Sequence, residues 1–514
     1  MSNLPNPTPQ GRAIIEAWNT TKRSIMVDAL AGCGKTTFLQ QLAPNITESR
    51  VLVLAFNKRN AEDLAAKMPT RFDCSTMNSI GHRALGRALA RRLVVDSDKT
   101  SKILKKVAEQ MGLGRLDSDT YSDATTLIRM AKSGGLMPDK FVAFKTLIPD
   151  RDESWEELCD MQMIDWSRDL QMLAWNTLVE SNYAALREGL IDYDDQIYLS
   201  VLGNGAYEKY PVVAVDEAQD LSRLNHLQLQ KSLQLGGRLI VVGDPRQAIY
   251  AFRGASSKSM GEIEGLQPGN FSRFPLSLTF RCAKVVVERN KAHAVGFEAA
   301  PTNLEGSVYN FNEPWNLDKI EHSGGKIAIL CRNNAPLMAA AFKLIRSGQG
   351  VTMLGRDIGK SLERLLKKIC GDKEGMAIPE VIEKVRAWQM KETDLARANG
   401  KEEKLSMIED RAESIVAVAE GCDGETMKDV LNAIVKLFSD QSGLVVLGTG
   451  HRAKGMEWHT VIHLDPWRIP SKYAKRAEEA GDPTAMEQEN NLRYVIETRT
   501  KDVLVLANLE DFEP

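Results

Sequence analysis

The chain has 514 residues, enough for roughly three or four domains of ordinary size. Its composition, 43% hydrophobic and 26% charged, is typical of globular protein and excludes wholesale disorder. The 66 basic and 69 acidic residues give a net charge of −3, which excludes a uniformly basic nucleic-acid binder but leaves room for a local basic groove.

Apolar runs and cysteines indicate the compartment. The best apolar run, 51–56, has only the length of a strand, so no membrane span is expected. The first ten residues lack the charged start and apolar core of a signal peptide. The seven dispersed cysteines fit neither a disulfide framework nor a zinc site. We therefore expect a cytoplasmic protein.

In chain order, short apolar strands alternate with helical stretches, which predicts parallel α/β sheets covered on both faces. The expected strands are 24–28, 51–56, 212–216, 239–244, 276–280, 327–331, 444–447, 461–465 and 503–507. Apolar residues at three- and four-residue spacing predict helices at 100–110, 123–132, 155–187, 361–369, 379–389, 406–419 and 427–438. The charged stretch 391–404 fits either a solvated helix face or a mobile connector.

This order of elements predicts two α/β cores, each interrupted by a helical insertion. The first core comprises 1–95 and 191–275, with 96–190 as its insertion. The second core comprises 276–355 and 441–514, with 356–440 as its insertion.

A phosphate-binding loop follows the first strand. Residues 29–37 read Ala-Leu-Ala-Gly-Cys-Gly-Lys-Thr-Thr and lie between a strand and a helix, although Ala29 replaces the usual first glycine. Gly32 and Gly34 allow consecutive N–H groups to face a phosphate. Lys35 supplies charge for the β- and γ-phosphates, and the Thr36 hydroxyl is a ligand for Mg²⁺. We predict an ATP site formed by Ala31, Gly32, Cys33, Gly34, Lys35, Thr36 and Thr37.

A pair of carboxylates lies far downstream. The apolar strand 212–215 ends in Asp216 and Glu217. Asp216 is expected to hold Mg²⁺ together with Thr36, and Glu217 to polarise an attacking water. A purely structural acidic turn is the alternative, which the phosphate-binding loop argues against. The long separation between Lys35 and Asp216 places the first insertion inside an ATPase core.

Further segments match known motifs in their order along the chain. They are Gln10 in its Pro-Thr-Pro-Gln context, Asn57, 76–82, 192–196 (Asp-Tyr-Asp-Asp-Gln), 243–255 (Gly-Asp-Pro-Arg-Gln-Ala-Ile-Tyr-Ala-Phe-Arg-Gly-Ala), 278–281, 449–457 and 494–500. This ordered set resembles the superfamily 1 DNA helicases of the UvrD/Rep/PcrA type, and 56–59 is closer to their F-box and phage branch. The resemblance implies an α/β fold with two RecA-like, parallel-sheet P-loop NTPase cores.

The resemblance also implies roles in nucleotide binding. It implies adenosine contacts by Gln10, Phe280 and Glu457. It further implies that Gln247 senses the γ-phosphate, and that Arg281 and Arg499 reach that phosphate and complete the catalytic set with Lys35, Asp216 and Glu217. On the residues alone, surface salt bridges are an equal alternative for the two arginines.

Single-stranded DNA contacts are implied in the same way, by Asn57, Thr76, His82, Tyr250, Phe252, Arg253, Thr449 and His451. Tyr250 and Phe252 would stack on successive bases, each stack contributing roughly 1–3 kcal/mol with little sequence preference. Two such aromatics are ordinarily core residues, but their place beside Gln247 and Arg253 favours stacking.

Two further groups are candidates for sites: the histidines His451, His459 and His463, and the tryptophans Trp155, Trp166 and Trp175. The histidines lack an accompanying cysteine or carboxylate cluster, which favours packing over a metal site. The tryptophans are expected to pack on one long helix, with duplex contact as the alternative. The second insertion is short for the family, so the duplex contacts and self-inhibition that the family assigns to this region stay open.

We therefore expect an ATP-dependent DNA helicase or single-stranded DNA translocase that acts in replication, repair or recombination, with 3′-to-5′ travel implied by the resemblance alone. ATP and Mg²⁺ are the expected cofactors. Single-stranded DNA, single/double-strand junctions and replication or repair proteins are the expected partners. An ATP-gated DNA-binding switch or loading factor is the alternative, motivated by the short second insertion. An RNA helicase is disfavoured by the string 249–255, and no fused nuclease domain is expected after Arg499.

Overall fold

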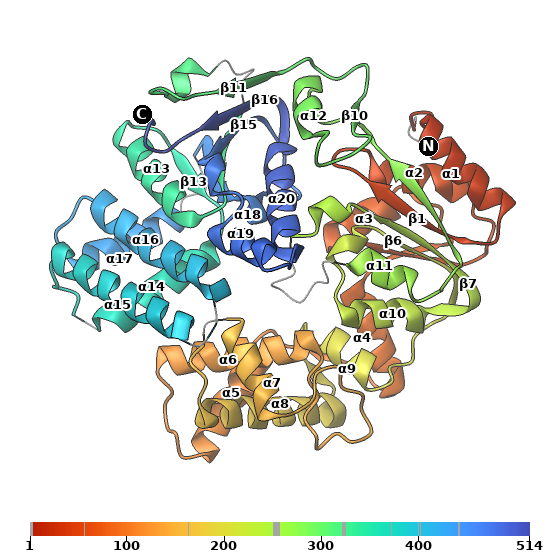
Figure 1. Cartoon of the computed structure of the whole chain (residues 1–514). Helices are drawn as coiled ribbons and strands as arrows, with labels where there is room; N and C mark the ends of the chain where they lie inside the picture. Colours follow the sequence, from red (N-terminus) through yellow and green to blue (C-terminus); the bar gives the residue numbers. More distant parts are fainter. Residues whose placement is uncertain are drawn as a thin grey trace. The chain divides into compact units, whose positions relative to one another are not determined.

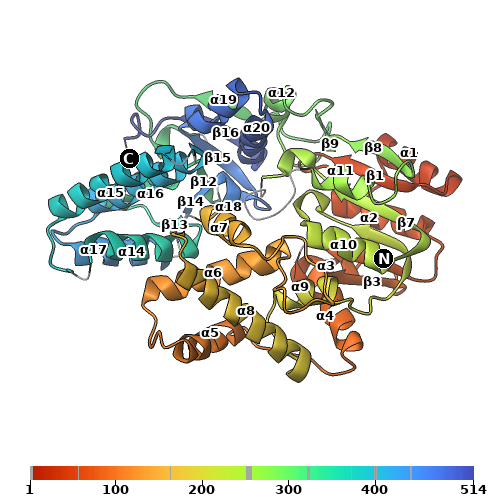
Figure 2. The ribbon, with the colours of Figure 1, turned by 60° about the horizontal axis from the view of Figure 1, so that its bottom comes forward.

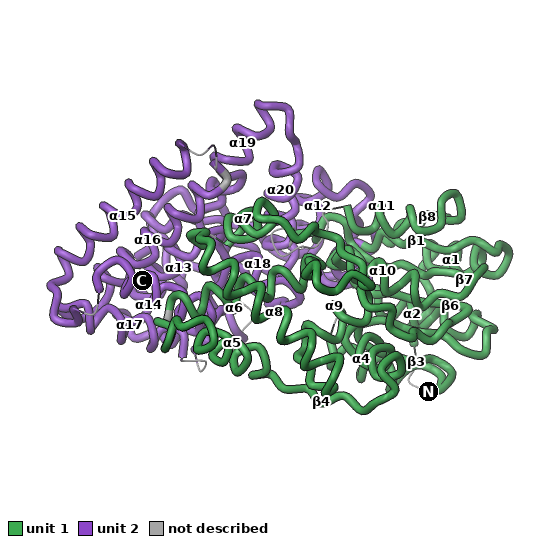
Figure 3. Tube along the Cα trace, turned by 90° about the horizontal axis from the view of Figure 1, so that it is seen from below, with its two compact units in different colours: residues 1–29, 34–276 green, residues 30–33, 277–514 purple. Residues whose placement is uncertain are grey.

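The computed structural model describes residues 4–513 except 56, 163, 250–257, 321–324, 372, 399, 401 and 440–442. The chain folds into two compact units, shown in separate colours in Figure 3. Unit 1 comprises 1–29 and 34–276, and unit 2 comprises 30–33 and 277–514. Among the described residues, no helix has both the length and the apolar character needed to cross a membrane.

Unit 1 is built on a parallel sheet. Its described strands are β1 (Ser24–Ala29), β2 (Val51–Ala55), β3 (Phe72–Thr76), β6 (Tyr210–Val215), β7 (Leu233–Gly243) and β8 (Phe271–Leu276), in the spatial order β3-β2-β6-β7-β1-β8. The central strands are almost entirely buried because helices cover both faces. Because parallel strands end at one edge of a sheet, the loops after β1, β6 and β7 meet there.

Helices flank this sheet and extend from it (Figure 1). Those beside the sheet are α1 (Pro9–Thr20), α2 (Lys35–Leu42), α3 (Lys58–Ala65), α4 (Met77–Ala88), α9 (Asp195–Leu202), α10 (Arg223–Ser232) and α11 (Ser259–Glu264). A separate group contains α5 (Lys99–Gln110), α6 (Ser118–Gly134), α7 (Asp152–Asp160) and α8 (Arg168–Glu188). The short strands β4 (Val94–Val95) and β5 (Leu190–Ile191) pair where the chain leaves for this group and returns. Whether 96–190 forms a separate domain stays a prediction.

The helix expected at 155–187 is wrong, because two helices occupy this stretch. Trp155 lies on α7 and Trp175 on α8, whereas Trp166 lies between them. The side chain of Ser167 accepts a hydrogen bond from the backbone of α8 and so begins a new helix. The indoles of Trp155 and Trp175 both donate to Asp150, at 2.8 and 2.7 Å, which fits a packing role.

Unit 2 contains the second parallel sheet. Its described strands are β11 (Ser307–Asn310), β12 (Ile327–Cys331), β13 (Val351–Met353), β14 (Val445–Thr449), β15 (Trp458–Leu464) and β16 (Thr500–Ala507), in the order β11-β16-β15-β12-β14-β13. The two sheets confirm the predicted α/β fold with two parallel-sheet cores. The strand expected at 276–280 is wrong: β8 ends at Leu276, and β9 (Leu278–Thr279) pairs instead with β10 (Glu298–Ala299).

The helices of unit 2 share a core with its sheet. They are α12 (Lys284–Asn290), α13 (Asn334–Arg346), α14 (Arg356–Cys370), α15 (Ile378–Ala398), α16 (Leu405–Gly421), α17 (Met427–Ser439), α18 (Gly450–Ala453), α19 (Lys472–Glu479) and α20 (Thr484–Glu497). Figure 2 shows α14–α17 grouped together. One apolar cluster runs from Ile329 of the sheet through Leu337 and Leu366 to Ile415 and Ile434. The charged stretch 391–404 begins inside helix α15, which ends at Ala398. The assignment of 356–440 as a separate domain stays a prediction.

Candidate active site

The phosphate-binding loop joins β1 to α2. Gly34, at the N-terminus of α2, has a φ of 76°, and Gly32 has a φ of 70°, a region that glycine occupies without strain. Cys33 between them is buried, and Thr37 lies in the first turn of α2. The first N–H groups of a helix lack intrahelical partners and attract anions. Both glycines thus take the backbone conformation that a phosphate-binding loop needs.

The tip of the loop groups with unit 2. Within that unit the N–H of Ala31 donates to the hydroxyl of Tyr494 at 2.8 Å, and the carbonyl of Gly32 accepts from the N–H of Phe280 at 2.9 Å. A Cβ atom built on Gly32 would lie only 2.5 Å from the Cβ atom of Arg281. Glycine is therefore required at this position by space as well as by conformation.

Lys35 faces three carboxylates. Its Nζ atom lies 2.5 Å from Oε2 of Glu217. Burial alone would lower the pKa of Lys35, but the charges of Glu217, Asp216 and Asp244 outweigh burial and raise it. Burial, assisted by Glu217, raises the pKa of Asp216 to about 6, and burial raises the pKa of Asp244. Three carboxylates around Lys35 leave excess negative charge, which favours binding of a divalent cation.

Thr36 and Asp216 fit a magnesium site. Helix α2 and the end of β6 bring these two predicted ligands together, with 3.4 Å between Oγ1 of Thr36 and Oδ2 of Asp216. Hydroxyl and carboxylate oxygens are ligands that Mg²⁺ accepts, usually alongside substrate phosphates. The donor set therefore suits the metal that the sequence implies.

A chain of hydrogen bonds runs from Lys35 to Gln247. Oε2 of Glu217 accepts from Lys35 at 2.5 Å and from Nε2 of Gln219 at 2.7 Å. The other amide atom of Gln219 accepts from the N–H of Asp244 at 3.0 Å, and Oδ2 of Asp244 accepts from Gln247 at 2.7 Å. Sequence reasoning missed Gln219 and Asp244. Their only signal was their place inside the motifs that contain Glu217 and Gln247.

Unit 2 holds a second charged cluster. Nε of Arg281 and Nζ of Lys501 each lie 2.6 Å from the carboxylate of Glu457, one at each oxygen. Burial opposes ionisation of Glu457, but Lys501 and Arg281 outweigh it and hold its pKa below the usual value. The structure thus brings two predicted residues, Arg281 and Glu457, into direct contact, and Lys501 joins them.

Arg499 is held beside this cluster by backbone carbonyls. Its side chain is 1% exposed and donates to the carbonyls of Val495 at 3.0 Å and Met456 at 3.3 Å. The carbonyl of Arg499 in turn accepts from the N–H of Trp458 at 3.0 Å. In this conformation the guanidinium is buried. Its partner Met456 is the residue that directly precedes Glu457 in the chain.

Phe280 and Gln10, the other residues for which the resemblance implies a contact with adenosine, differ in exposure. Phe280 is 56% exposed, so part of its aromatic surface is accessible for stacking on a base. Gln10 lies partly buried at the start of α1, whose N-cap Thr8 accepts from the N–H of Gly11 at 3.0 Å.

Two of the residues for which the resemblance implies a contact with single-stranded DNA cap helices in this structure. The side chain of Asn57 accepts from the N–H of Asn60 at 2.8 Å, and that of Thr76 accepts from the N–H of Ser79 at 3.2 Å. Asn57 follows β2 and Thr76 ends β3, so both lie at the carboxyl edge of the sheet. Each residue therefore already has a local structural role.

His82 lies against α9. Its Nδ1 atom is 3.3 Å from the amide nitrogen of Gln196, and a Cβ atom on Gly81 would lie 2.1 Å from the carbonyl oxygen of Gln196. In unit 2, Thr449 is buried at the end of β14 and His451 lies on α18. Three other residues for which the resemblance implies a contact with single-stranded DNA lie outside the described residues: Tyr250, Phe252 and Arg253.

The segment 192–196 anchors the helical group of unit 1. Asp195 pairs with Lys99 at 2.5 Å and with Lys132 at 2.8 Å, and Asp192 pairs with Lys132 at 2.6 Å. Lys99, Lys132 and Asp195 are at most 1% exposed. These pairs join α5 and α6 to the start of α9. The sequence offered no sign of this role for the lysines, because lysine is almost always exposed.

The three histidines weighed as a metal site are not gathered around one. His463 is buried on β15, with Nδ1 3.7 Å from Oε1 of Glu497, which also pairs with Arg289 at 2.9 Å. Among the described residues, no three His, Cys, Asp or Glu side chains are arranged to hold a metal ion.

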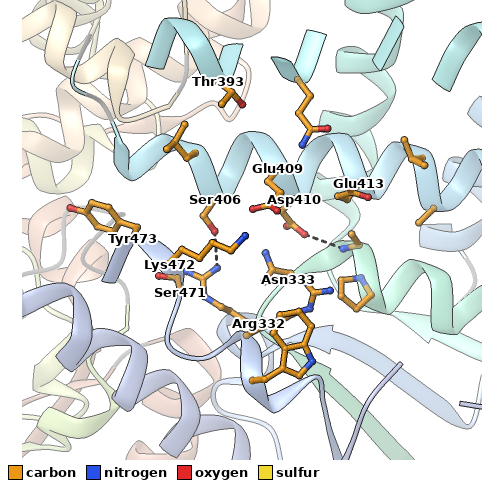
Figure 4. Close-up of a pocket in the computed structure, with 18 of the residues that line it drawn as sticks. Arg332, Asn333, Thr393, Ser406, Glu409, Asp410, Glu413, Ser471, Lys472 and Tyr473 are labelled. Carbon is orange, nitrogen blue, oxygen red and sulfur yellow. Dashed lines mark hydrogen bonds between the residues drawn. The ribbon is translucent and has the colours of Figure 1, made fainter. Parts of the chain in front are cut away.

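A cavity of about 760 Å³ opens in unit 2 (Figure 4). Asn333 and Arg332 lie below it after β12, and α16 lines it from above with Ser406 and Asp410. Arg332 donates to Ser406 at 3.2 Å and forms a bidentate pair with Glu489, from Nε to Oε2 and from Nη2 to Oε1. The cavity lies at the carboxyl ends of parallel strands, where ligands bind in open sheets. Sequence reasoning did not identify it.

Comparison with known proteins places the chain. Residues 10–266 match the family described as UvrD/REP helicase N-terminal domain. The chain is 24% identical to F-box DNA helicase protein 1 of Schizosaccharomyces pombe, over 98% of this chain and 58% of that protein. It is 20% identical to a probable DNA helicase II homolog of Rickettsia conorii, over 95% and 91%, and 21% identical to ATP-dependent DNA helicase PcrA of Leuconostoc citreum, over 66% and 49%. The chain spans about half the length of the F-box helicases it matches. The family match covers half of the chain, and the chain belongs to the UvrD/REP helicase family of superfamily 1.

Proposed function

We propose that the chain is an ATP-dependent DNA helicase or single-stranded DNA translocase. The observation that carries the proposal is the pairing of Lys35 with Glu217 beside the Thr36–Asp216 contact. It supplies a phosphate-binding cation, a metal-binding pair and a water-positioning carboxylate at one place. The names of the relatives in three organisms support DNA as the substrate.

Phosphoryl transfer needs positioning and charge neutralisation more than covalent chemistry. Lys35 would leave Glu217 for the β- and γ-phosphates of ATP, which frees the Glu217 carboxylate to orient the attacking water. Thr36 and Asp216 would hold Mg²⁺, which neutralises charge on the phosphates when bound. Gln247, at the end of the hydrogen-bonded chain, is the proposed sensor of the γ-phosphate.

Arg281 and Arg499 are proposed to stabilise charge on the γ-phosphate in the transition state. Supporting this, Arg281 is only partly exposed and its partner Glu457 is shared with Lys501, so Lys501 can keep the carboxylate paired when Arg281 leaves. Arg499 is held in place by hydrogen bonds to the backbone carbonyls of Val495 and Met456. Such arginines raise turnover by about 10³ or more.

Single-stranded DNA is proposed to contact Asn57, Thr76 and His82 in unit 1, Thr449 and His451 in unit 2, and Tyr250, Phe252 and Arg253. Helix N-termini favour phosphate, and Asn57 and Thr76 each lie at the N-terminus of a helix. We further propose 3′-to-5′ travel, action at single/double-strand junctions and work alongside replication or repair proteins, on the family resemblance.

ATP turnover with and without single-stranded DNA tests the proposal. We expect strong stimulation by DNA, weaker stimulation by RNA, and a fall of about 10² or more in turnover for Lys35→Ala. Duplexes with a 3′ or a 5′ tail then test unwinding and polarity. Turnover that DNA stimulates without strand displacement would favour the loading factor or a translocase, and absence of ATP turnover would overturn the proposal.

A further inference from the structure

The backbone at Glu217 is held in an unusual conformation. Its φ of 55° and ψ of 41° lie in the left-handed region, which is unfavourable for a residue with a side chain. The surrounding structure must therefore fix the turn Ala218–Asp220 that follows. Any contact that fixes this turn also fixes the direction of the Glu217 carboxylate.

One such contact comes from helix α11. The hydroxyl of Ser259 donates to the carbonyl of Ala218 at 2.7 Å, and both residues are almost completely buried. Ala218 directly follows Glu217 in the chain. The bond therefore links Ser259 of α11, 41 residues downstream, to the peptide next to the proposed water-positioning carboxylate.

A buried histidine orients this hydroxyl. Nε2 of His226 lies 2.8 Å from Oγ of Ser259. A carbonyl oxygen can only accept, so the hydroxyl proton is directed to Ala218 and Nε2 of His226 is the donor to Ser259. His226 lies on α10 and is 5% exposed, and its Nδ1 atom faces Glu262 at 3.2 Å. The proposed chemistry gives neither His226 nor Ser259 a role.

We propose that Ser259, oriented by His226, is a positioning residue for Glu217. It keeps the Ala218 carbonyl in place and so aims the Glu217 carboxylate at the site of the attacking water. This inference rests on the proposed ATPase activity. Loss of the hydroxyl removes the 2.7 Å bond to the Ala218 carbonyl, which keeps the longer 3.4 Å bond from the N–H of Leu221. The turn is then held less firmly and can relax away from its left-handed conformation.

The test compares Ser259→Ala, Ser259→Thr and a control in the full chain, with kcat and KM for ATP measured at saturating oligo(dT). A misdirected catalytic group costs up to about 10²-fold in rate, so we expect Ser259→Ala to lower kcat by about tenfold or more. KM should change little, and Ser259→Thr should restore kcat because it keeps the hydroxyl. The control Ser133→Ala removes a hydroxyl that donates to the carbonyl of Met130 on α6, at 3.1 Å, and should leave kcat unchanged.

A double-mutant cycle separates positioning from general structural damage. If Ser259 acts through Glu217, Ser259→Ala should have almost no further effect on single-turnover hydrolysis in a Glu217→Gln background. An equal loss in both backgrounds, or wild-type kcat in Ser259→Ala, would overturn the inference. If Ser259→Ala does not fold, His226→Leu against His226→Gln gives the same comparison, because glutamine keeps a donor. If the wild-type chain does not turn over ATP, both the proposed function and this inference are wrong. If the wild type turns over ATP and Ser259→Ala has the same kcat, only this inference is wrong.

Discussion

The ammonium of Lys35 and the carboxylate of Glu217 form an ion pair with 2.5 Å between Nζ and Oε2. The two groups have different proposed tasks, one at the phosphates and one at the water. The pair must therefore open when a nucleotide binds. Glu217 competes with the incoming phosphates for Lys35.

Glu217→Gln should consequently bind ATP more tightly while hydrolysing it more slowly. Removal of the competing charge frees Lys35, and a hydrogen bond to a charged group contributes roughly 1.5 kcal/mol, so we expect about tenfold tighter binding. Loss of the general base should lower turnover by about 10²–10⁴. Titration with a fluorescent ATP analogue and a turnover assay measure the two effects. Glu208→Gln, which removes a carboxylate paired with Arg50 elsewhere in unit 1, should change neither.

Arg281→Ala should leave nucleotide binding nearly intact and lower DNA-stimulated turnover by about 10³. The proposed role of this guanidinium is to stabilise the transition state, so the substitution should lower kcat and leave KM for ATP almost unchanged. Lys284→Ala serves as the control, because Lys284 is exposed and pairs only with Glu305 among the ion pairs described for it. Steady-state kinetics with saturating oligo(dT) make the comparison. Wild-type turnover in Arg281→Ala would contradict the role.

Glu497 should make stability depend on pH. Burial opposes its ionisation, but His463 and Arg289 outweigh burial and lower its pKa from 4.5 to about 2. Its contribution to stability is therefore present above pH 4.5 and is lost as the pH falls towards 2. Such a shift corresponds to roughly 3 kcal/mol.

Glu497→Gln should thus lower the free energy of unfolding by roughly 3 kcal/mol at pH 7, with a smaller difference from wild type at pH 3.5. Urea unfolding followed by fluorescence at several pH values measures this difference. Glu288→Gln, at an exposed carboxylate on the neighbouring α12, is the matched control. A difference that does not depend on pH would show that Glu497 acts through packing rather than charge.

Asp195→Asn should destabilise unit 1 by about 3–5 kcal/mol, because it leaves Lys99 and Lys132 buried with too little opposing charge. The pKa of Lys99 is already lowered by burial, which outweighs the charge of Asp195. Thermal unfolding and hydrogen exchange in α5 and α6 are the measurements. Asp119→Asn, at a partly buried residue in the first turn of α6 and outside this ion-pair cluster, should have little effect. A wild-type melting temperature for Asp195→Asn would contradict the expectation.

The central strands of both sheets could be predicted from sequence, and the edge strands could not. β2 and β12 are apolar runs because helices bury both of their faces. β3 and β11, each at the edge of a sheet, expose part of their surface and contain polar residues. Their sequences therefore resemble those of loops. The edge strand β8 has the same mixed pattern, which is why the strand expected at 276–280 overlaps it only at Leu276.

The same division applies to the candidate site. Lys35, Thr36, Asp216 and Glu217 lie in compact motifs whose spacing reflects one loop or one strand end, so sequence alone brought them together. Ser259 could not be predicted to contact Ala218, because that contact depends on how α11 packs after the sheet has formed. Long-range contacts between ordinary residue types carry no local signal.

The order of strands in the first sheet has a consequence during synthesis. Strand β1 lies between β7 and β8, so its neighbours leave the ribosome about 200–250 residues after it, a delay of roughly 10–50 s at ordinary elongation rates. Throughout that interval β1 lacks both of its native partner strands, which pair with Ile25, Met26 and Val27 in the folded sheet. During synthesis this apolar segment is therefore open to non-native contacts for longer than β7 or β8, and a slow codon run before 233 would lengthen that interval.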